Sequence, residues 1–240
     1  LNRITFLYGP PAIDWYTAQR ARLQGEVNKR GLAIEVGGHL LPDLLPREMF
    51  PEHPDWFPRN AAGARVPTFN MNPFSREALE YVGNRAVSYF GRIPEASLYH
   101  AWPDDIGGGG WTSEPGKEDY TPSDQSLLVM NHIATRLREK LPEANVAFLA
   151  YHDTVEAPRV VKPAPGVVYF YAPRERCYAH SLDDATCAMN RVYARALEKA
   201  LPAFGAASAE VFEYYADEVL FQDVTNPPLP EVMAADTRYY

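Results

Sequence analysis

The stretch "ASLYHAWPDD", residues 96–105, ends a predicted strand in two adjacent acids. Its first part is apolar and aromatic, as a buried strand requires. Pro103 ends the strand because proline cannot donate a hydrogen bond to a sheet. Asp104 and Asp105 follow, ahead of consecutive glycines at 107–110. The stretch therefore delivers two carboxylates to the end of a buried strand.

Short apolar runs alternate with amphipathic stretches along the rest of the chain. Strands are expected at 3–9, 32–39, 97–103, 145–153, 166–175 and 208–217. Helices are expected at 14–31, 75–91, 123–141 and 190–201, and the tail after Pro230 is a further candidate. Gly31 suits the end of the first helix and Ser75 the N-cap of the second. Strands that alternate with helices, without hairpin signals, predict parallel pairing.

Right-handed crossovers between parallel strands give a doubly wound sheet or a barrel. A doubly wound fold needs a glycine-rich phosphate turn after its first strand, and "YGPPAID" (8–14) is not one. The expected strand ends carry polar residues that would meet at one barrel mouth: His39, Asp104/Asp105, His152/Asp153, Arg174/Glu175 and Glu213/Asp217. We therefore predict an α/β fold of the (β/α)8 TIM-barrel type.

About six βα units are visible where a complete barrel has eight, so the barrel is expected to be incomplete or to contain strands that the pattern hides. Residues 1–240 would form one domain, and the start at Leu1 suggests excision from a longer chain. A secreted or periplasmic location is favoured over a cytoplasmic one.

Composition limits the partners of the chain. The net charge of -8 argues against nucleic acid, whose phosphates require a basic face. No apolar run approaches the roughly 20 residues of a membrane span. No cofactor is expected. The spacing of Cys177 and Cys187 matches no zinc or redox signature, which favours a disulfide or two free thiols over a metal site.

Two carboxylates at a barrel mouth suit hydrolysis of a glycosidic bond, in which one acid protonates the leaving oxygen and the other attacks or activates water. Asp104 or Asp105 is the candidate acid, and Glu213 the candidate nucleophile or base. Alternatively, the two aspartates work together, one of them orienting a substrate amide that serves as nucleophile. The structural alternative is that both cap the glycine loop or the next helix and that Glu213 is a satisfied barrel residue.

Strand periodicity sorts the neighbouring side chains into faces. In the strand at 97–104, one face is expected to carry Leu98, His100, Trp102 and Asp104. In the strand at 211–217, one face is expected to carry Val211, Glu213, Tyr215 and Asp217. Phe212 and Tyr214 would then lie on the opposite face, against helices.

The expected sugar subsite draws on several strand ends and loops. Its candidate residues are His39, Trp102, Trp111, His152, Asp153, Arg174, Tyr215 and Asp217. Among the loop aromatics, Trp56 and Trp111 have the stronger claim because loops bury large side chains poorly. Arg174 and Arg176 could clamp a carboxylate or sulfate, or form ion pairs with Glu175 or Asp183.

Several stretches together resemble a known family. They are "EVGGHLLPDLLPREMFPEHPDWFP" (35–58), "NMNPFSREAL" (70–79), "WPDD" (102–105), "AYHDTVEAPRVVKPAPGVVYFYAP" (150–173), "CYAHSLDD" (177–184) and "EYYAD" (213–217). The chain resembles the domain-of-unknown-function family 4838, which is similar to glycoside hydrolases of the α-glucuronidase and hexosaminidase kind. The resemblance implies a TIM barrel in which the strand at 97–104 is strand four and that at 209–215 strand seven, positions that hold the acid and the nucleophile in many glycosidases.

The expected function is therefore that of a glycoside hydrolase acting on a polysaccharide or glycan. One alternative is a carbohydrate-binding barrel without catalysis. Another is a metal-dependent hydrolase that uses His39, His152 and Asp153, although no His-x-His pair supports it.

Overall fold

Six parallel strands form one sheet in the order of the sequence. The computed structural model describes residues 3–6, 10–205, 208–215, 217 and 230–240. The strands are β1 (Arg3–Phe6), β2 (Ala33–Gly38), β3 (Leu98–Ala101), β4 (Val146–Ala150), β5 (Val167–Tyr171) and β6 (Ala209–Val211). Each pairs in parallel with the next along the chain. This sequential order is that of a TIM barrel, whereas a doubly wound sheet reverses its strand order.

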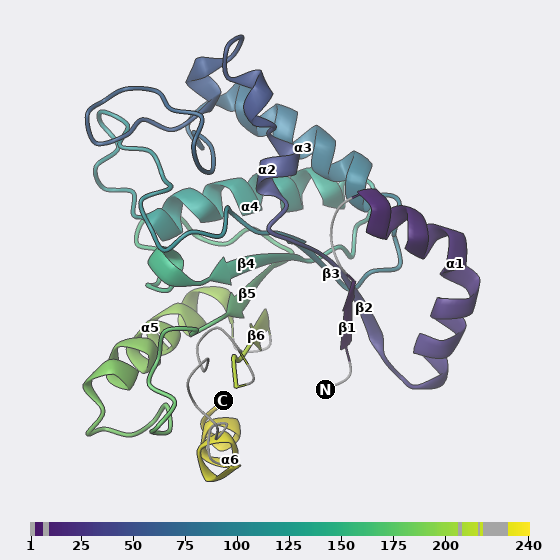
Figure 1. The fold of residues 1–240 in the computed structure, drawn as a ribbon, viewed down its shortest axis with the longest axis vertical. Coiled ribbons are helices and arrows are strands. Elements are labelled where there is room, and N and C mark those ends of the chain that lie inside the picture. The colour runs from purple at the N-terminus through teal and green to yellow at the C-terminus, as the bar shows by residue number, and fades with distance from the viewer. Residues whose placement is uncertain (1–2, 7–9, 206–207, 216, 218–229) are drawn as a thin grey trace.

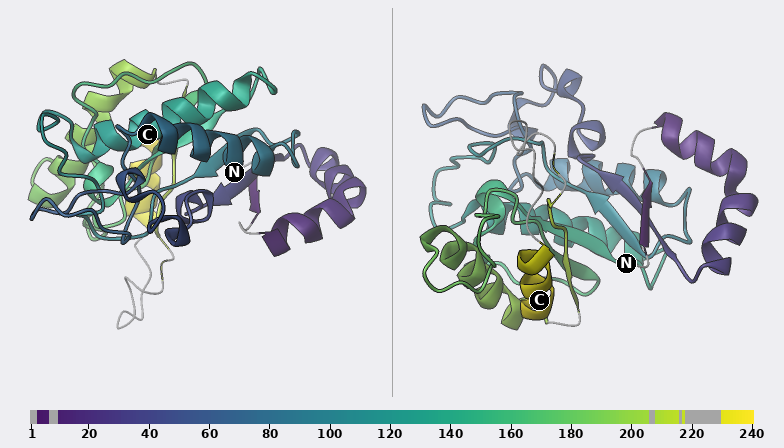
Figure 2. Two further views of the ribbon diagram at one scale, coloured as in Figure 1. Left: turned by 90° about the horizontal axis from the view of Figure 1, so that it is seen from above. Right: turned by 60° about the horizontal axis from the view of Figure 1, so that its bottom comes forward.

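Helices cover the outer side of this sheet (Figure 1). They are α1 (Pro10–Lys29), α2 (Leu41–Leu44), α3 (Arg76–Phe90), α4 (Pro122–Arg138), α5 (Ala188–Phe204) and α6 (Pro230–Tyr239). Three 3-10 turns, η1 (Arg47–Met49), η2 (Pro54–Trp56) and η3 (His152–Thr154), lie in the connections. Helix α1 lies toward the β1 edge, and α5 and α6 toward the β6 edge (Figure 2).

Within the described residues β1 and β6 are the two edges of the sheet and do not pair with each other. The predicted α/β fold of the TIM-barrel type, in its incomplete form, is therefore confirmed. The predicted helices and strands match the observed ones apart from a few residues at their ends, except that β6 ends at Val211, well before the expected end at 217.

Alternating side chains of the strands feed two separate apolar clusters. The outer cluster joins Tyr99, Phe148 and Tyr169 to the apolar stripes of the helices, such as Val82 and Phe90 of α3. The inner cluster lies on the opposite face of the sheet and contains Leu98, Ala147, Leu149, Val168, Phe170 and Ala172. The inner cluster corresponds to the filled interior of a barrel, and it forms the base on which the strand ends rest.

Local chemistry explains where the central helices begin. Ser75 accepts a hydrogen bond from the amide of Ala78 and caps α3, as its position in the sequence predicts. Thr121 and Asp124 form a reciprocal capping box at the start of α4. Each cap fixes the residue at which its helix begins. It therefore also fixes where the loop that follows the preceding strand ends.

Gly37 of β2 has a backbone conformation in which a side chain would point at β3. Gly37 has a φ of +116°, and a Cβ placed on it would lie 2.0 Å from the carbonyl oxygen of His100. Only glycine fits that position. Between the same two strands, Nε2 of the fully buried His100 lies 3.1 Å from Oε2 of Glu35, so a buried pair joins β2 to β3 inside the barrel.

No helix in the part of the chain that the structure describes is long and apolar enough to span a membrane.

The expectation that Phe212 and Tyr214 lie against helices is wrong. Phe212 packs against Trp102 and Phe170, with ring centroids 6.2 and 5.7 Å away, and Tyr214 joins the inner cluster. Neither lies against the helices. Because β6 has already ended at Val211, strict strand alternation does not extend to these residues.

Candidate functional site

Side chains from successive strand ends meet around Asp105. Its carboxylate accepts a hydrogen bond from the hydroxyl of Tyr151, at 3.2 Å. Nε2 of His39 lies 3.8 Å and Nε2 of His152 4.0 Å from the same oxygen, Oδ1. The loops after β2, β3 and β4 therefore converge on one carboxylate whose side chain is 60% exposed.

The hydrogen bonds of His39 and Tyr151 indicate which of their atoms carry a proton. Nδ1 of His39 bonds to the carbonyl oxygen of Pro103, so Nδ1 carries the proton and Nε2 faces Asp105. Burial first, and then the nearby charge of Asp105, raise the pKa of Tyr151 above its ordinary value. The phenol therefore remains protonated and donates to the carboxylate.

A second chain of polar contacts continues from His152 to the end of β6. Nδ1 of His152 lies 2.9 Å from Oε1 of Glu175, on the other side of the imidazole ring from Asp105. Arg174 lies 3.5 Å from Glu175 and donates through Nε to Asp217 at 2.8 Å. The imidazole of His152 thus joins the loops after β5 and β6 to the group around Asp105. Together the five loops after β2 to β6 form one set of polar residues, called the rim below: His39, Asp105, Tyr151, His152, Arg174, Glu175 and Asp217.

Aromatic rings line the base of this rim. Tyr151 and Tyr214 are stacked, with centroids 6.1 Å apart and an interplanar angle of 18°. The guanidinium of Arg174 lies over Tyr214, 5.9 Å from its centroid. Trp102 packs edge-on against His39, at 5.2 Å. Flat apolar rings below a polar rim are the arrangement by which proteins hold the faces of sugar rings.

Asp104 points away from this group into an ion pair. Arg47 donates to both of its carboxylate oxygens, at 2.7 and 2.6 Å. The amide of Asn70 donates to Oδ2 at 2.6 Å, and the amide of Asp104 donates back to the side chain of Asn70 at 2.8 Å. The adjacent aspartates therefore differ: Asp104 ties the long loop 40–72 to the end of β3, and Asp105 faces the rim.

Two residues beside these aspartates have strained backbones. Asn70 (φ +47°) and His152 (φ +49°) are the non-glycine residues with positive φ in the described part of the chain. Asn70 bonds to Asp104, and His152 lies between Asp105 and Glu175. Such conformations cost of order 1–3 kcal/mol each and concentrate at functional sites.

Asp153 lies beside this rim under the glycine loop. It lines a small pocket together with His39, Trp111 and Tyr151. Burial raises the pKa of Asp153 above its ordinary value, and a hydrogen bond from the backbone of Gly109 opposes this only in part. A carboxyl group with a raised pKa in a pocket is the kind of group that active sites use as a proton donor.

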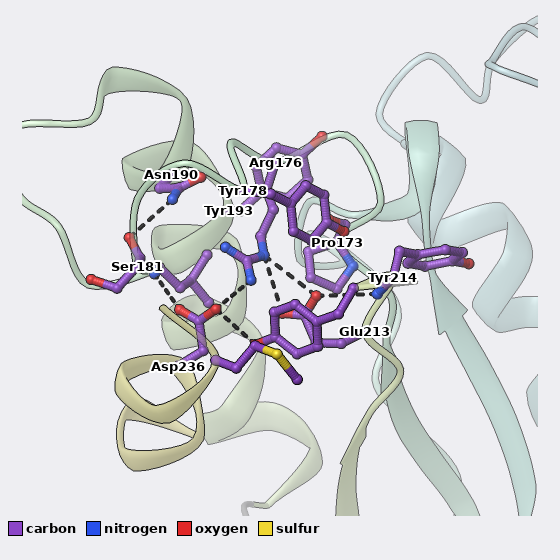
Figure 3. Close-up of polar contacts among 12 residues, drawn as sticks. Pro173, Arg176, Tyr178, Ser181, Asn190, Tyr193, Glu213, Tyr214 and Asp236 are labelled. Carbon is purple, nitrogen blue, oxygen red and sulfur yellow. Dashed lines mark hydrogen bonds and ion pairs between the residues drawn. The ribbon is translucent and has the colours of Figure 1, made fainter. Parts of the chain in front are cut away.

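Glu213 belongs to a separate buried network (Figure 3). Oε1 of Glu213 lies 3.1 Å from Nε of Arg176, and the hydroxyl of Tyr240 donates to the same carboxylate. Arg176 also pairs with the fully buried Asp236 of α6, which accepts from the hydroxyl of Tyr215 at 2.7 Å. Among the described residues, no hydrogen bond or ion pair joins Glu213 to Asp104 or Asp105.

The structure brings together most of the expected subsite but separates some members. His39, Trp102, His152, Asp153, Arg174 and Asp217 lie at or beside the rim, whereas Tyr215 belongs to the network of Arg176 and Asp236. The expectation that loops leave their tryptophans exposed is wrong: Trp56 and Trp111 are 6% and 7% exposed. Their loops fold back on the barrel, and His53 stacks on Trp56 at 3.8 Å.

The sequence pattern did not identify several residues that position the site. Arg47 and Asn70 lie in the long proline-rich loop, far from Asp104 in the sequence. Glu175 is among the strand-end residues expected at the barrel mouth, but the role expected for it is an ion pair with an arginine. Asp236 lies on the last helix, 60 positions after Arg176. For Glu175, its place at the end of the predicted strand 166–175 is a usable signal; the others depend on long-range contacts.

The family model "Domain of unknown function (DUF4838)" matches residues 7–240. The chain belongs to this family. No curated protein matches it.

Among solved structures, the chain is similar to endo-glycoceramidase II from Rhodococcus sp., with a TM-score of 0.53 and 12% identity over 100% of this chain and 61% of that one. The same enzyme in complex with a five-membered iminocyclitol gives a TM-score of 0.50, again at 12% identity and with 100% and 61% coverage. A GH42 β-galactosidase, Gan42B from G. stearothermophilus, gives 0.41 at 13% identity, over 74% of this chain and 36% of that one.

The chain thus spans 61% of the length of the first of these neighbours. At such identities the likeness concerns the fold, and it agrees with the sequential parallel sheet. The fold is an incomplete barrel of the TIM type.

Proposed function

We propose that the chain is the barrel part of a glycoside hydrolase acting on a polysaccharide or glycan. The observation that carries the proposal is the single rim formed by the loops after β2 to β6, in which carboxylates and imidazoles stand over stacked aromatic rings. Active sites of TIM barrels lie at this carboxyl-terminal face. Glycosidases need two carboxyl groups on either side of the scissile bond, and the rim offers more than one.

Asp105 is the proposed general acid. It is the carboxylate on which three strand ends converge, and Tyr151, His39 and His152 are placed to orient it. Its exposed side chain can reach the leaving oxygen of a sugar bound at the rim. Asp104 is the proposed positioning residue, because both of its oxygens already accept hydrogen bonds from Arg47.

Glu175 is the proposed second carboxylate. It lies beyond the imidazole of His152 from Asp105, so a sugar ring bound over that imidazole would have one carboxyl group near each side. The guanidinium of Arg174 lies 3.5 Å from the carboxylate of Glu175. Glu213, which the family resemblance favours, is the competing candidate for this role.

Replacement of each glutamate by glycine separates the two candidates. In the glycine variant of the true nucleophile or base, azide enters the vacated space and attacks the anomeric carbon, while the acid still protonates the departing alcohol. Turnover of an aryl glycoside should fall at least about 10²-fold in Glu175→Gly and recover with azide. Glu213→Gly should lose stability, and azide should not restore its activity. Azide rescue of Glu213→Gly alone would instead assign the role to Glu213.

A binding barrel without catalysis is the second candidate, and one observation favours it. Arg47 and Arg176 engage Asp104 and Glu213, two of the three carboxylates that the sequence suggests for chemistry. A panel of aryl glycosides tests this directly, and a five-membered iminocyclitol serves as a first binding probe. Turnover of a member with a poor leaving group, such as an unsubstituted phenyl glycoside, that falls sharply in Asp105→Asn but not in the surface control Asp119→Asn supports the enzyme. Binding of sugars without turnover across the panel supports the alternative.

A further inference from the structure

Three metal-ligating side chains meet in the loop between β5 and α5. The sulfur atoms of Cys177 and Cys187 and a ring nitrogen of His180 all lie within 4.8 Å of one another. Sγ of Cys177 is 3.2 Å from Nδ1 of His180. Within the described residues, no other set of three histidine, cysteine, aspartate or glutamate ligand atoms is gathered this closely. None of the three residues has a part in the proposed hydrolysis.

A buried side chain holds this loop in its folded form. Asn190, which is fully buried, donates to the carbonyl oxygens of Cys177, His180 and Ser181 at 2.9, 3.0 and 2.9 Å. It also accepts from the amide of Cys177 at 2.8 Å. Arg176 donates to the carbonyl oxygens of Cys177 and His180 from the same side. Two of the three candidate ligands are therefore placed by a dedicated framework, which reduces the entropy that a bound ion would have to overcome.

The third ligand, Cys187, is the N-cap residue of α5. A thiolate there is a good ligand for a soft divalent ion. Two thiolates and one imidazole form a known zinc ligand set that leaves one position open.

We propose that Cys177, His180 and Cys187 bind one zinc-class divalent ion, with water in the fourth position. Binding releases the two thiol protons to solvent and leaves a neutral imidazole as the third ligand. The ion would connect the end of β5 to the start of α5. Since Arg174 and Glu175 precede Cys177 by a few residues, it would also hold the segment that carries them to the rim.

The experiment measures metal binding rather than activity. The protein is purified under reducing conditions, exchanged into Co²⁺, and examined by absorption spectroscopy and elemental analysis. We expect one cobalt per chain and a thiolate-to-cobalt charge-transfer band in the near ultraviolet. His180→Ala should weaken binding by at least the roughly 10–100-fold that loss of a supporting residue costs. Cys177→Ser/Cys187→Ser should abolish the band, and the control His53→Ala should leave both readings unchanged.

Two results would overturn the proposal. In the first, the reduced protein takes up less than a tenth of an equivalent of cobalt or zinc, or binds it without the charge-transfer band. In the second, the band survives in Cys177→Ser/Cys187→Ser. Mass spectrometry of the protein purified without reductant identifies the competing state, a Cys177–Cys187 disulfide, by the loss of two hydrogens. Circular dichroism of the variants confirms that each one folds.

Discussion

Removal of the Asp236 carboxylate should destabilise the β6 side of the barrel more than any surface change. Asp236 and its partner Arg176 are both fully buried at the side chain, and Asp236 also accepts from the amide of Leu182 at 2.6 Å and from Tyr215 at 2.7 Å. Burial alone would lower the pKa of Arg176, but the carboxylates of Glu213 and Asp236 raise it above its ordinary value. In Asp236→Ala, a buried guanidinium therefore keeps its charge and loses one of its two carboxylate partners.

The size of the loss follows from these contacts. Removal of one partner from a buried ion pair costs about 3–5 kcal/mol because the other charge remains buried without full compensation. For a domain of this length, each kcal/mol lowers the melting temperature by roughly 2–4 °C, so a fall of about 6–20 °C is expected. Asp236→Asn should lose less, since an amide oxygen can still accept from Leu182 and Tyr215.

Urea denaturation followed by circular dichroism measures this free energy of unfolding. Asp183→Ala is the matched control, because Asp183 is exposed, follows Leu182, whose amide donates to Asp236, and accepts a hydrogen bond from the nearby hydroxyl of Ser181. Its change should stay within about 0.5 kcal/mol. A loss of less than about 1 kcal/mol in Asp236→Ala, or of no more than in Asp183→Ala, would show that the network of Arg176 does not stabilise the fold. The structural role of Glu213 in that network would then be refuted as well.

Three further predictions concern stability. Gly37→Ala should destabilise the sheet by more than about 1 kcal/mol in urea melts, because its Cβ would meet the His100 carbonyl; Gly25→Ala, with open space around it, should not. Asp124 accepts hydrogen bonds from three backbone amides at 159–161, and although burial alone would raise its pKa, these and the bonds from Thr121 lower it. The contribution of Asp124 to the free energy of unfolding is therefore present above the ordinary aspartate pKa and is lost as the pH falls through the lowered value. Asp124→Asn should lower stability at pH 7 and make the loss of stability at acid pH less steep. An unchanged loss at acid pH would contradict this. The pH dependence that Asp153 contributes is opposite: its pKa is raised, so its contribution to stability is present below the ordinary aspartate pKa and is lost as the pH rises through the raised value. Asp153→Asn should remove this part of the pH dependence of stability. A wild-type pH profile of stability in the variant would refute the raised pKa of Asp153.

The sequence was sufficient to predict the fold because its signals are local. Apolar runs, the stripe of α3, the Ser75 cap and the glycine after α1 each follow from periodicity or turn chemistry within a few residues. The order of strands then follows from the handedness of the crossovers. The exception is β6, where aromatic residues continue the strand pattern after pairing has ended at Val211.

The candidate site was harder to predict because its details depend on distant partners. The sequence could place Asp104 and Asp105 at a strand end, but it could not indicate that Arg47 engages the first and leaves the second free to face the rim. The zinc-class cluster was missed for a related reason. Two cysteines alone suggested no metal site, and His180 becomes a third ligand only when Asn190 folds the loop around it.

The leaving-group dependence of Asp105→Asn tests the central proposal most directly. A general acid matters most when the departing oxygen is a poor leaving group, and it contributes about 10²–10⁴-fold there. We expect kcat/KM of Asp105→Asn to fall by this factor for an alkyl glycoside and to stay near the wild-type value for a dinitrophenyl glycoside of the same sugar. An equal fall for both substrates, or none for either, would contradict the assignment of Asp105 as the acid at the rim.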